Sequence, residues 1–280
     1  MQKSEHIYLS IKDFLVSGET FDLIYSKDLD LLKTFPVPNI EELPKYYESQ
    51  DYISHTDEKR GFLSRLYQLV KKWSLQKKTN LIYNQNNGIG SLLDVGAGTG
   101  DFLKVAKKKG WEVYGTEPNP NASKLASEKG VKLGTSLKDF AGKQFDVITL
   151  WHVLEHIPNL EETISELSSL VKPKGVLIIA VPNFKSFDAK YYGKYWAAYD
   201  VPRHLWHFSK EAMENLFAKN FKLKKIEPMI FDSFYVSLLS EKYKTGNKIS
   251  LKAFYIGLKS NLKAKQSKEY SSHIYCFKKV

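Results

Sequence analysis

The chain has 280 residues, a formal net charge of +11 and a pI of about 9.3, and 42% of its residues are hydrophobic. This composition is typical of a globular protein with one substantial core and excludes a disordered chain. No apolar run approaches the roughly 20 residues that span a bilayer, and the N-terminus lacks the apolar segment of a signal peptide. A single cysteine, Cys276, excludes an intrachain disulfide and a cysteine-based zinc site. We therefore expect a cytoplasmic protein.

The basic excess suggests either nucleic acid or an anionic membrane surface as a partner. However, only Arg60, Arg65 and Arg203 are arginines, so lysine supplies 39 of the 42 basic residues. Arginine is the residue expected for bidentate contacts with phosphates and bases. The pattern favours a lysine-rich solvated surface and disfavours nucleic acid as a partner.

The first 60 residues are predicted to form short strands. Residues 14–16 and 21–25 flank the turn-prone segment 17–19, which predicts a hairpin. Residues 31–35 predict a third strand, and residues 41–48 a short helix. We treat this part of the chain, residues 1–61, as an N-terminal accessory region.

Alternating strands and helices follow. Apolar residues at helical spacing predict a helix from 62 to about 82, and a polar linker covers 84–90. Near-continuous apolar runs then alternate with amphipathic segments, which favours a doubly wound α/β sheet that is mostly parallel. The predicted strands are 91–95, 112–116, 131–133, 145–150, 175–181, 223–229 and 271–277, and the predicted helices are 100–109, 121–129, 160–171, 210–219 and 231–266.

The most informative segment is the turn after the strand at 91–95. Gly96, Gly98 and Gly100 let the chain turn sharply and let a ligand touch its backbone. The spacing is G-x-G-x-G rather than the G-x-G-x-x-G of dinucleotide-binding proteins, because Asp101 takes the place of the third glycine.

Two acids at strand ends refine this prediction. Asp94 comes just before the turn, where it would repel a pyrophosphate and attract a cationic cofactor tail. Glu117 ends the next strand, where a carboxylate can accept hydrogen bonds from both ribose hydroxyls. A nucleoside with a positively charged tail fits both acids, so S-adenosylmethionine is the predicted cofactor and methyl transfer the predicted chemistry.

Four segments in order resemble the motifs of class I S-adenosylmethionine-dependent methyltransferases, especially bacterial enzymes of the quinone and sugar types. These segments are 92–103, 113–118, 145–158 and 170–183. The resemblance implies a Rossmann-like sheet of seven strands with an antiparallel last strand at 271–277. It makes residues 62–280 the methyltransferase domain, with a linking helix at 62–83 and a lid or acceptor-binding insertion at 184–208.

The resemblance also implies a cofactor site, with S-adenosylhomocysteine as the product. The turn and Asp94 would hold the methionine part, and Glu117 the ribose. The implied cofactor-binding residues are Asp94, Gly96, Ala97, Gly98, Gly100, Glu117, Pro118, Ser136, Leu137, Trp151 and His152.

Methyl transfer is an in-line displacement that depends mainly on holding acceptor and methyl group together. A base is needed only when the acceptor carries a proton at the reacting atom. His152 directly follows a strand and would face the ligand, although a structural role fits it equally well. Tyr192, Arg203 and His204 belong to an aromatic segment at the same end of the sheet. We expect these four residues to approach a small-molecule acceptor.

Residues 152–156 spell H-x-x-E-H, a string found in one class of zinc proteases. That motif belongs to a helix in another fold. Some methyltransferases acting on catechols or RNA 3′ ends hold a divalent cation with an acid and histidine cluster here, which Glu155 and His156 match in part. His152 stands where such a cluster would need a carboxylate, so no metal ligands are assigned.

Two other functions stay open at this point. An RNA methyltransferase would account for the charge, and a non-catalytic cofactor-binding protein would need the same intact turn. The identity of the acceptor, the atom methylated and the oligomeric state are not determined by the sequence.

Overall fold

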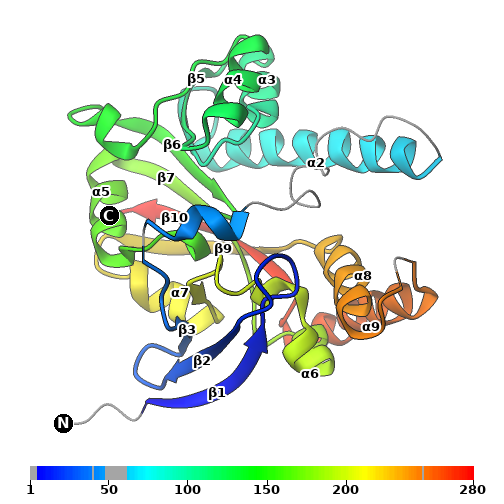
Figure 1. Cartoon of the computed structure of the whole chain (residues 1–280). Helices are drawn as coiled ribbons and strands as arrows, with labels where there is room; N and C mark the ends of the chain where they lie inside the picture. Colours follow the sequence, from blue (N-terminus) through cyan, green and yellow to red (C-terminus); the bar gives the residue numbers. More distant parts are fainter. Residues whose placement is uncertain (1–4, 40, 48–61, 248) are drawn as a thin grey trace.

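The computed structural model describes residues 5–39, 41–47, 62–247 and 249–280 (Figure 1). The strands form two sheets, one of six strands in the order β5-β4-β6-β7-β10-β9 and one of four in the order β1-β2-β3-β8. The strands of the six-stranded sheet are β4 (Ser91–Val95), β5 (Glu112–Thr116), β6 (Phe145–Trp151), β7 (Val171–Pro182), β9 (Phe221–Pro228) and β10 (Ser272–Lys279).

The six-stranded sheet confirms the predicted doubly wound, mostly parallel α/β fold. Strands β5, β4, β6 and β7 are parallel neighbours, and β10 is antiparallel to both β7 and β9. The last strand is therefore antiparallel, as predicted. The sheet has six strands rather than seven because the segment predicted at 131–133 contributes only a bridge between Thr116 and Gly134.

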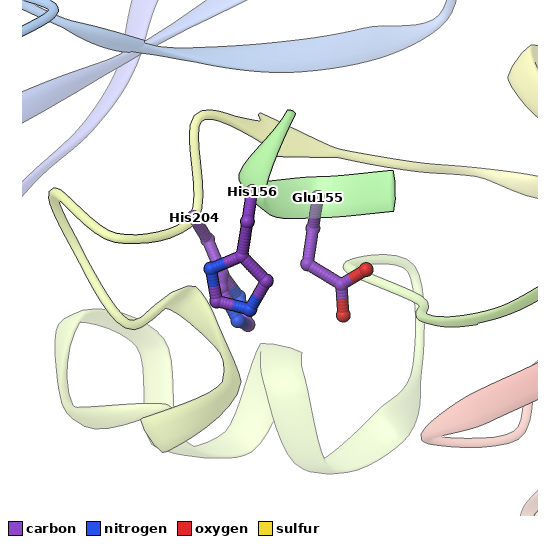
Figure 2. A group of neighbouring side chains, drawn as sticks. All are labelled: Glu155, His156 and His204. Atoms are coloured by element: carbon purple, nitrogen blue, oxygen red, sulfur yellow. The ribbon is translucent and has the colours of Figure 1, made fainter. Parts of the chain in front are cut away.

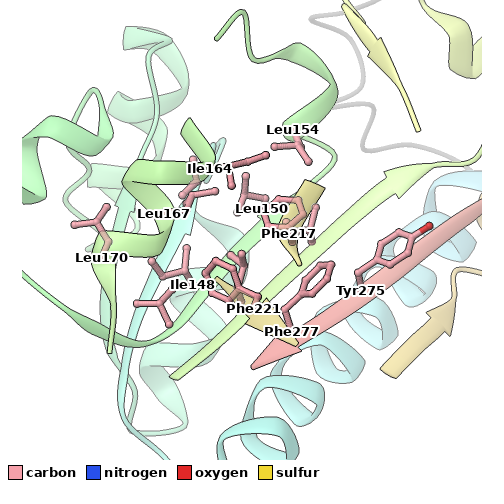
Figure 3. Packing of buried hydrophobic residues seen from close by; sticks show 14 of the residues in the cluster. Ile148, Leu150, Leu154, Ile164, Leu167, Leu170, Phe217, Phe221, Tyr275 and Phe277 are labelled. Carbon is pink, nitrogen blue, oxygen red and sulfur yellow. The ribbon is translucent and has the colours of Figure 1, made fainter. Parts of the chain in front are cut away.

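Helices cover both faces of this sheet, because neighbouring apolar residues of each strand point to opposite sides. Leu92 packs with α2, α3 and α4, whereas Leu93 packs with α5 and α7. Figure 3 shows the second core, where Ile148 and Leu150 meet Leu167 of α5. These helices are α2 (Phe62–Asn86), α3 (Asp101–Lys108), α4 (Pro120–Glu128), α5 (Leu160–Leu170) and α7 (Lys210–Phe217).

The N-terminal strands form a hairpin, but not where it was predicted. Strand β1 (Glu5–Lys12) pairs with β2 (Thr20–Ser26), and residues 14–16 form the turn. The prediction failed because the Asp13 carboxylate accepts hydrogen bonds from the backbone N–H groups of Leu15, Val16 and Ser17, which fixes a turn. Strand β3 (Leu31–Phe35) has the predicted bounds, and the 3-10 turn η1 (Leu43–Tyr47) replaces the predicted helix.

The segment 184–208 joins the N-terminal sheet to the main sheet. Its strand β8 (Trp206–His207) pairs with β3, and Asn183 bridges Phe208. Trp196 and Tyr199 are buried in a shared core with Phe21 and Leu23 of β2. This segment is therefore largely packed core, with three short helical pieces, α6 (Phe187–Tyr192), η4 (Gly193–Tyr195) and η5 (Ala197–Tyr199).

Two helices replace the long helix predicted at 231–266. Helix α8 (Asp232–Thr245) ends at Gly246, whose φ of 80° stops the helix, and α9 (Leu251–Ser267) begins after it. Within the described ranges, no helix combines the length and apolar character needed to cross a membrane.

Candidate active site

The glycine turn between β4 and α3 presents open backbone. Gly98 has a φ of 54°, and a Cβ atom there would meet no atom within 4 Å, so a ligand can approach closely. Gly96 has a φ of 66°, and a Cβ atom there would lie 2.6 Å from Cγ2 of Val153. The backbone N–H of Ala97 donates to the carbonyl of Thr116 at 2.8 Å, which ties the turn to β5. The turn therefore lies against both neighbouring strand ends.

Asp94 is buried below this turn. The hydroxyl of Thr149 donates a hydrogen bond of 2.6 Å to its Oδ1 atom. Burial raises the pKa of Asp94 to about 7, against the opposing effects of Thr149 and Lys78. A cationic group placed beside this carboxyl would favour its ionised form. The environment suits the predicted contact with the cationic end of the cofactor.

Glu117 follows β5 and faces the same turn. Its Oε2 atom accepts a hydrogen bond of 2.8 Å from the N–H of Gly98, and its Oε1 atom accepts one of 2.9 Å from the N–H of Asn119. These bonds hold the carboxylate at the carboxyl edge of the sheet, where ligands of open α/β folds bind. The structure thus brings the two acids selected from the sequence to one turn.

Replacing Glu117 with Gln is expected to weaken S-adenosylmethionine binding about 10- to 150-fold. The amide keeps the size of the side chain but loses the charge that strengthens hydrogen bonds from ribose hydroxyls, an effect of roughly 1.5–3 kcal/mol. Calorimetric titration of both proteins measures it. Glu112→Gln, at the opposite end of β5 from Glu117, serves as the control. Unchanged affinity in the Glu117 variant would refute the ribose assignment.

Three more of the implied cofactor-binding residues, which the family resemblance places near the adenine, lie on loops close to this edge. Pro118 is exposed directly after Glu117, and Ser136 is exposed before the 3-10 turn η2 (Leu137–Phe140). The N–H of Ser136 donates to Asp139 at 3.3 Å, and Leu137 packs against the main core. Their adenine contacts stay predictions.

Lys78 of α2 is a site residue that the sequence analysis missed. Its Nζ atom lies 4.2 Å from the centre of the Trp151 ring. Burial lowers the pKa of Lys78, while Asp94 and Asp232 act in the opposite direction. Nothing in the sequence separates Lys78 from the other lysines of α2, because only the packing of α2 on the sheet directs it toward Asp94.

His152 follows β6 in a left-handed conformation, with a φ of 57°. Its Nε2 atom lies 3.2 Å from Oδ2 of Asp232, and its Nδ1 atom lies 3.4 Å from Oε1 of Glu155. Burial opposes the charged form, but the two carboxylates raise the pKa of His152 to about 10. The imidazole is therefore protonated at neutral pH.

Asp232 is a second residue that the sequence analysis missed. It begins α8, just after β9, so it lies at the same carboxyl edge as Asp94 and Glu117. An acid following a strand was the signal used for those two residues. It was overlooked here because the sequence around residue 232 was assigned wholly to one long helix.

A cavity of about 430 Å³, here called the acceptor pocket, lies beside His152. Apolar residues supply part of its wall, including Pro182, Ala197 and Leu239. Its polar groups include His152, Glu155, Asp200, His204, Asp232 and Lys242. The structure thus brings His152 and His204 together, as the sequence analysis expected.

Glu155, His156 and His204 form a cluster at this pocket (Figure 2). One ligating atom from each lies within 4.8 Å of the others. The Nδ1 atoms of the two histidines lie 3.0 Å from the carbonyl of Arg203 and 2.9 Å from that of Ala198, respectively. The Glu155 carboxylate is buried, and its Oε1 atom lies 3.4 Å from Nδ1 of His152. His204 is the member that the sequence motif did not contain.

Arg203 and Tyr192 do not line the acceptor pocket, and both expectations are corrected. The Arg203 guanidinium is buried and lies 2.9 Å from Asp13 and 2.7 Å from Asp200. Its Nη1 atom donates to the carbonyl of Tyr46 at 2.8 Å. Tyr192 is buried in the core behind the pocket. Both side chains turn inward because the segment 184–208 packs on the N-terminal sheet.

A family model described as a methyltransferase domain matches residues 50–225, more than half of the chain. The chain belongs to this methyltransferase family. The prediction of an S-adenosylmethionine-dependent methyltransferase of class I is confirmed, and S-adenosylmethionine is its cofactor.

The methyltransferase is similar to two curated relatives named ubiquinone biosynthesis O-methyltransferase. The Rickettsia typhi protein is 26% identical over 240 residues, which cover 80% of this chain and 94% of the relative. The Actinobacillus pleuropneumoniae protein is 27% identical over 192 residues, which cover 63% of this chain and 80% of the relative.

Solved structures share the fold at low sequence identity. Magnesium protoporphyrin IX methyltransferase from Synechocystis PCC 6803 with bound SAH has a TM-score of 0.57 at 14% identity, covering 86% of this chain and all of that one. A putative sarcosine dimethylglycine methyltransferase from Galdieria sulphuraria has a TM-score of 0.53 at 14% identity, covering 77% of this chain and 87% of that one.

Proposed function

We propose that this methyltransferase methylates a hydroxyl oxygen of a small acceptor with an apolar body. The observation that carries the proposal is the acceptor pocket, which joins an apolar wall to His152 and His204. His152 precedes Val153, the residue packed against Gly96 of the cofactor turn. The names of the two curated relatives, both O-methyltransferases, support an oxygen acceptor.

The chain's charges orient the cofactor on one side of this pocket. S-adenosylmethionine supplies the electrophilic methyl group. Glu117 would hold the ribose, Asp94 the amino group and Lys78 the carboxylate of the methionine part. Glu117 accepts a hydrogen bond from the turn, and Asp94 and Lys78 each shift the pKa of the other, which supports these assignments.

Two histidines handle the acceptor's proton and charge. The Nδ1 atom of His204 faces the carbonyl of Ala198 at 2.9 Å, so we assign the proton to Nδ1 and the lone pair to Nε2. His204 would then accept the hydroxyl proton, which makes the oxygen a better nucleophile toward the methyl group that the cofactor supplies. The protonated His152, held between Asp232 and Glu155, would place positive charge near the acceptor and favour the ionised hydroxyl before the attack. An acidic hydroxyl, such as a phenol or enol, fits this arrangement best.

Replacing Asp232 with Asn should move the alkaline limb of the pH–rate profile to lower pH. Asp232 and Glu155 raise the pKa of His152 to about 10, so activity is expected to fall as the pH rises through that value. Removing one nearby opposite charge lowers such a pKa by roughly 1–3 units. Initial rates between pH 7 and 11 measure the shift. Glu214→Gln on α7 is the control, and an unmoved limb would contradict the role of His152.

An acceptor panel tests the proposed function. The wild-type protein is incubated with labelled S-adenosylmethionine and matched phenols, their methyl ethers, the corresponding anilines, and total RNA. Methylation of phenols alone is the expected result. Transfer to anilines or RNA would refute the oxygen acceptor, and cofactor binding with no transfer to any member would favour a non-catalytic protein.

The Glu155 cluster favours a second candidate role, which is the binding of a divalent cation. Imidazole and carboxylate are ligands that Zn²⁺ accepts, and carbonyls that hold the distal ring nitrogen are typical of such sites. A cation held by Glu155, His156 and His204 would supply Lewis acidity at the acceptor pocket. Activity that survives exhaustive chelation supports His204 as a base. Activity lost on chelation and restored by one cation supports the second role.

A further inference from the structure

On helix α9, small residues are buried and large apolar residues are exposed, the reverse of the usual arrangement. Its buried face consists mainly of small residues, and Gly257 approaches α8 so closely that a Cβ atom would lie 2.9 Å from the Cα atom of Phe234. Its large apolar residues instead face outward, each at least half exposed. These residues are Leu251, Phe254, Tyr255, Leu258 and Leu262. Their spacing of three or four residues places them in one stripe along the helix.

This stripe continues across a groove to α2. Phe254 lines an apolar cavity of about 690 Å³ whose other wall is α2. Trp73 of α2 and Phe231, before α8, are both more than 40% exposed at its rim, with ring centres 5.1 Å apart. Figure 1 shows α2 above and the α8–α9 pair below, both extending to the right of the main sheet. An apolar surface of this extent normally marks an interaction site.

The charge of the two outer helices has a single sign. The sequence of α2 contains five basic residues and that of α9 contains four, and neither contains an acidic residue. Some of these cations have acidic neighbours, such as Lys71, which pairs with Asp101. Others, including Lys72 and Lys265, are exposed. The apolar stripe is thus flanked by positive charge without intervening carboxylates on its own helices.

We propose that the face formed by α2, α8 and α9 docks on an anionic lipid bilayer. Apolar side chains at helical spacing, flanked by lysines, are the pattern of helices that lie in the membrane interface. Anionic headgroups complement the lysines, and the acyl boundary takes the leucine and aromatic side chains. A globular protein partner would also cover apolar residues, but would need carboxylates matched to dispersed lysines. The absence of acids on α2 and α9 favours a continuous negative surface.

The groove borders the acceptor pocket, because Met229, Asp232 and Tyr235 line both cavities. Docking on this face would therefore bring a lipid-dissolved acceptor to the side of the pocket. This last consequence rests on the proposed function, whereas docking itself does not.

Vesicle co-sedimentation of the full chain tests the proposal without measuring activity. We expect binding to vesicles of phosphatidylcholine with phosphatidylglycerol, and much weaker binding to phosphatidylcholine alone. Salt should weaken the binding. Lys259→Glu with Lys265→Glu should reduce partitioning at least about thirtyfold. Lys219→Glu, just after α7, with Lys222→Glu on β9 has the same charge change and should reduce partitioning much less.

A second, independent experiment removes part of the apolar stripe. Leu258→Ser with Leu262→Ser should reduce partitioning about tenfold or more, whereas Leu125→Ser on α4 should not. Thermal melts of each variant verify folding, and the exposure of both leucines makes large destabilisation unexpected. The proposal is overturned if wild type ignores anionic vesicles at low salt, or if the stripe variants bind like their controls. It is also overturned if sedimentation velocity shows that α9 instead joins two copies of this chain.

Discussion

Replacing His204 with Gln is expected to lower kcat by 10²- to 10⁴-fold while changing the affinity for S-adenosylmethionine little. The glutamine keeps a polar side chain in the pocket but cannot accept the hydroxyl proton, and general base catalysis typically contributes a factor of this size. Cofactor affinity should change little because His204 lines the acceptor pocket and not the glycine turn. Steady-state rates with a phenolic acceptor and calorimetry with the cofactor measure the two effects.

The two measurements separate this role from a structural one, because a structural defect would lower the cofactor affinity together with kcat. His207→Gln is a suitable comparison, because His207 is buried against Thr34 at 3.0 Å and lies outside the acceptor pocket. A His204 variant with near-normal kcat, or one that loses cofactor affinity as well, would contradict the assignment.

Replacing Arg203 with Met is expected to destabilise the protein by about 3–5 kcal/mol without a specific effect on chemistry. Arg203 links the β1–β2 turn through Asp13, the turn η1 through the carbonyl of Tyr46, and its own loop through Asp200. Removing one partner of a buried ion pair leaves an uncompensated charge, which costs about this much. Urea unfolding measures the difference. Lys185→Met is a control, because its pairs with Asp30 and Glu211 are partly exposed and worth about 1 kcal/mol or less.

The difference in stability between the wild type and the Arg203 variant should depend on pH. Burial tends to raise the pKa of Asp13, but Arg203 and the backbone amides of Ser17 and Leu15 keep it below its usual value of 3.8. The stabilisation by Arg203 is therefore present above that value and is lost as the pH falls below it. The wild type and the variant should converge in acid. Equal stability at neutral pH would show that Arg203 has no linking role.

The local sequence pattern was sufficient to predict most strands of the main sheet. Leu92 and Leu93 open a short apolar run that ends at a glycine turn, and the same alternation recurs at Val147 and Ile148. Such runs predict buried parallel strands without knowledge of distant contacts. The failures were at segments whose conformation depends on a partner. The turn at 14–16 is held by Asp13, and residues 131–133 lack the strand geometry that their apolar character suggested.

The proximity of the predicted cofactor-site residues could be predicted because they lie at or near strand ends. Asp94, Gly98 and Glu117 lie within one βαβ unit, so their proximity is a property of that unit. The acceptor pocket joins residues from β6, the loop before β8 and α8, which are far apart in the sequence. Lys78 and Asp232 face the site only because α2 and α8 pack as they do.

The sequence by itself determined the class of this protein, namely a doubly wound α/β methyltransferase, and it predicted a nucleoside site at the glycine turn. The physical reason is that strand periodicity, turn glycines and strand-end acids act over short distances along the chain. Only the tertiary structure decided which polar residues line the acceptor pocket. It moved Arg203 into a buried ion pair and brought His204 beside His152, because burial and long-range packing set the direction of each side chain.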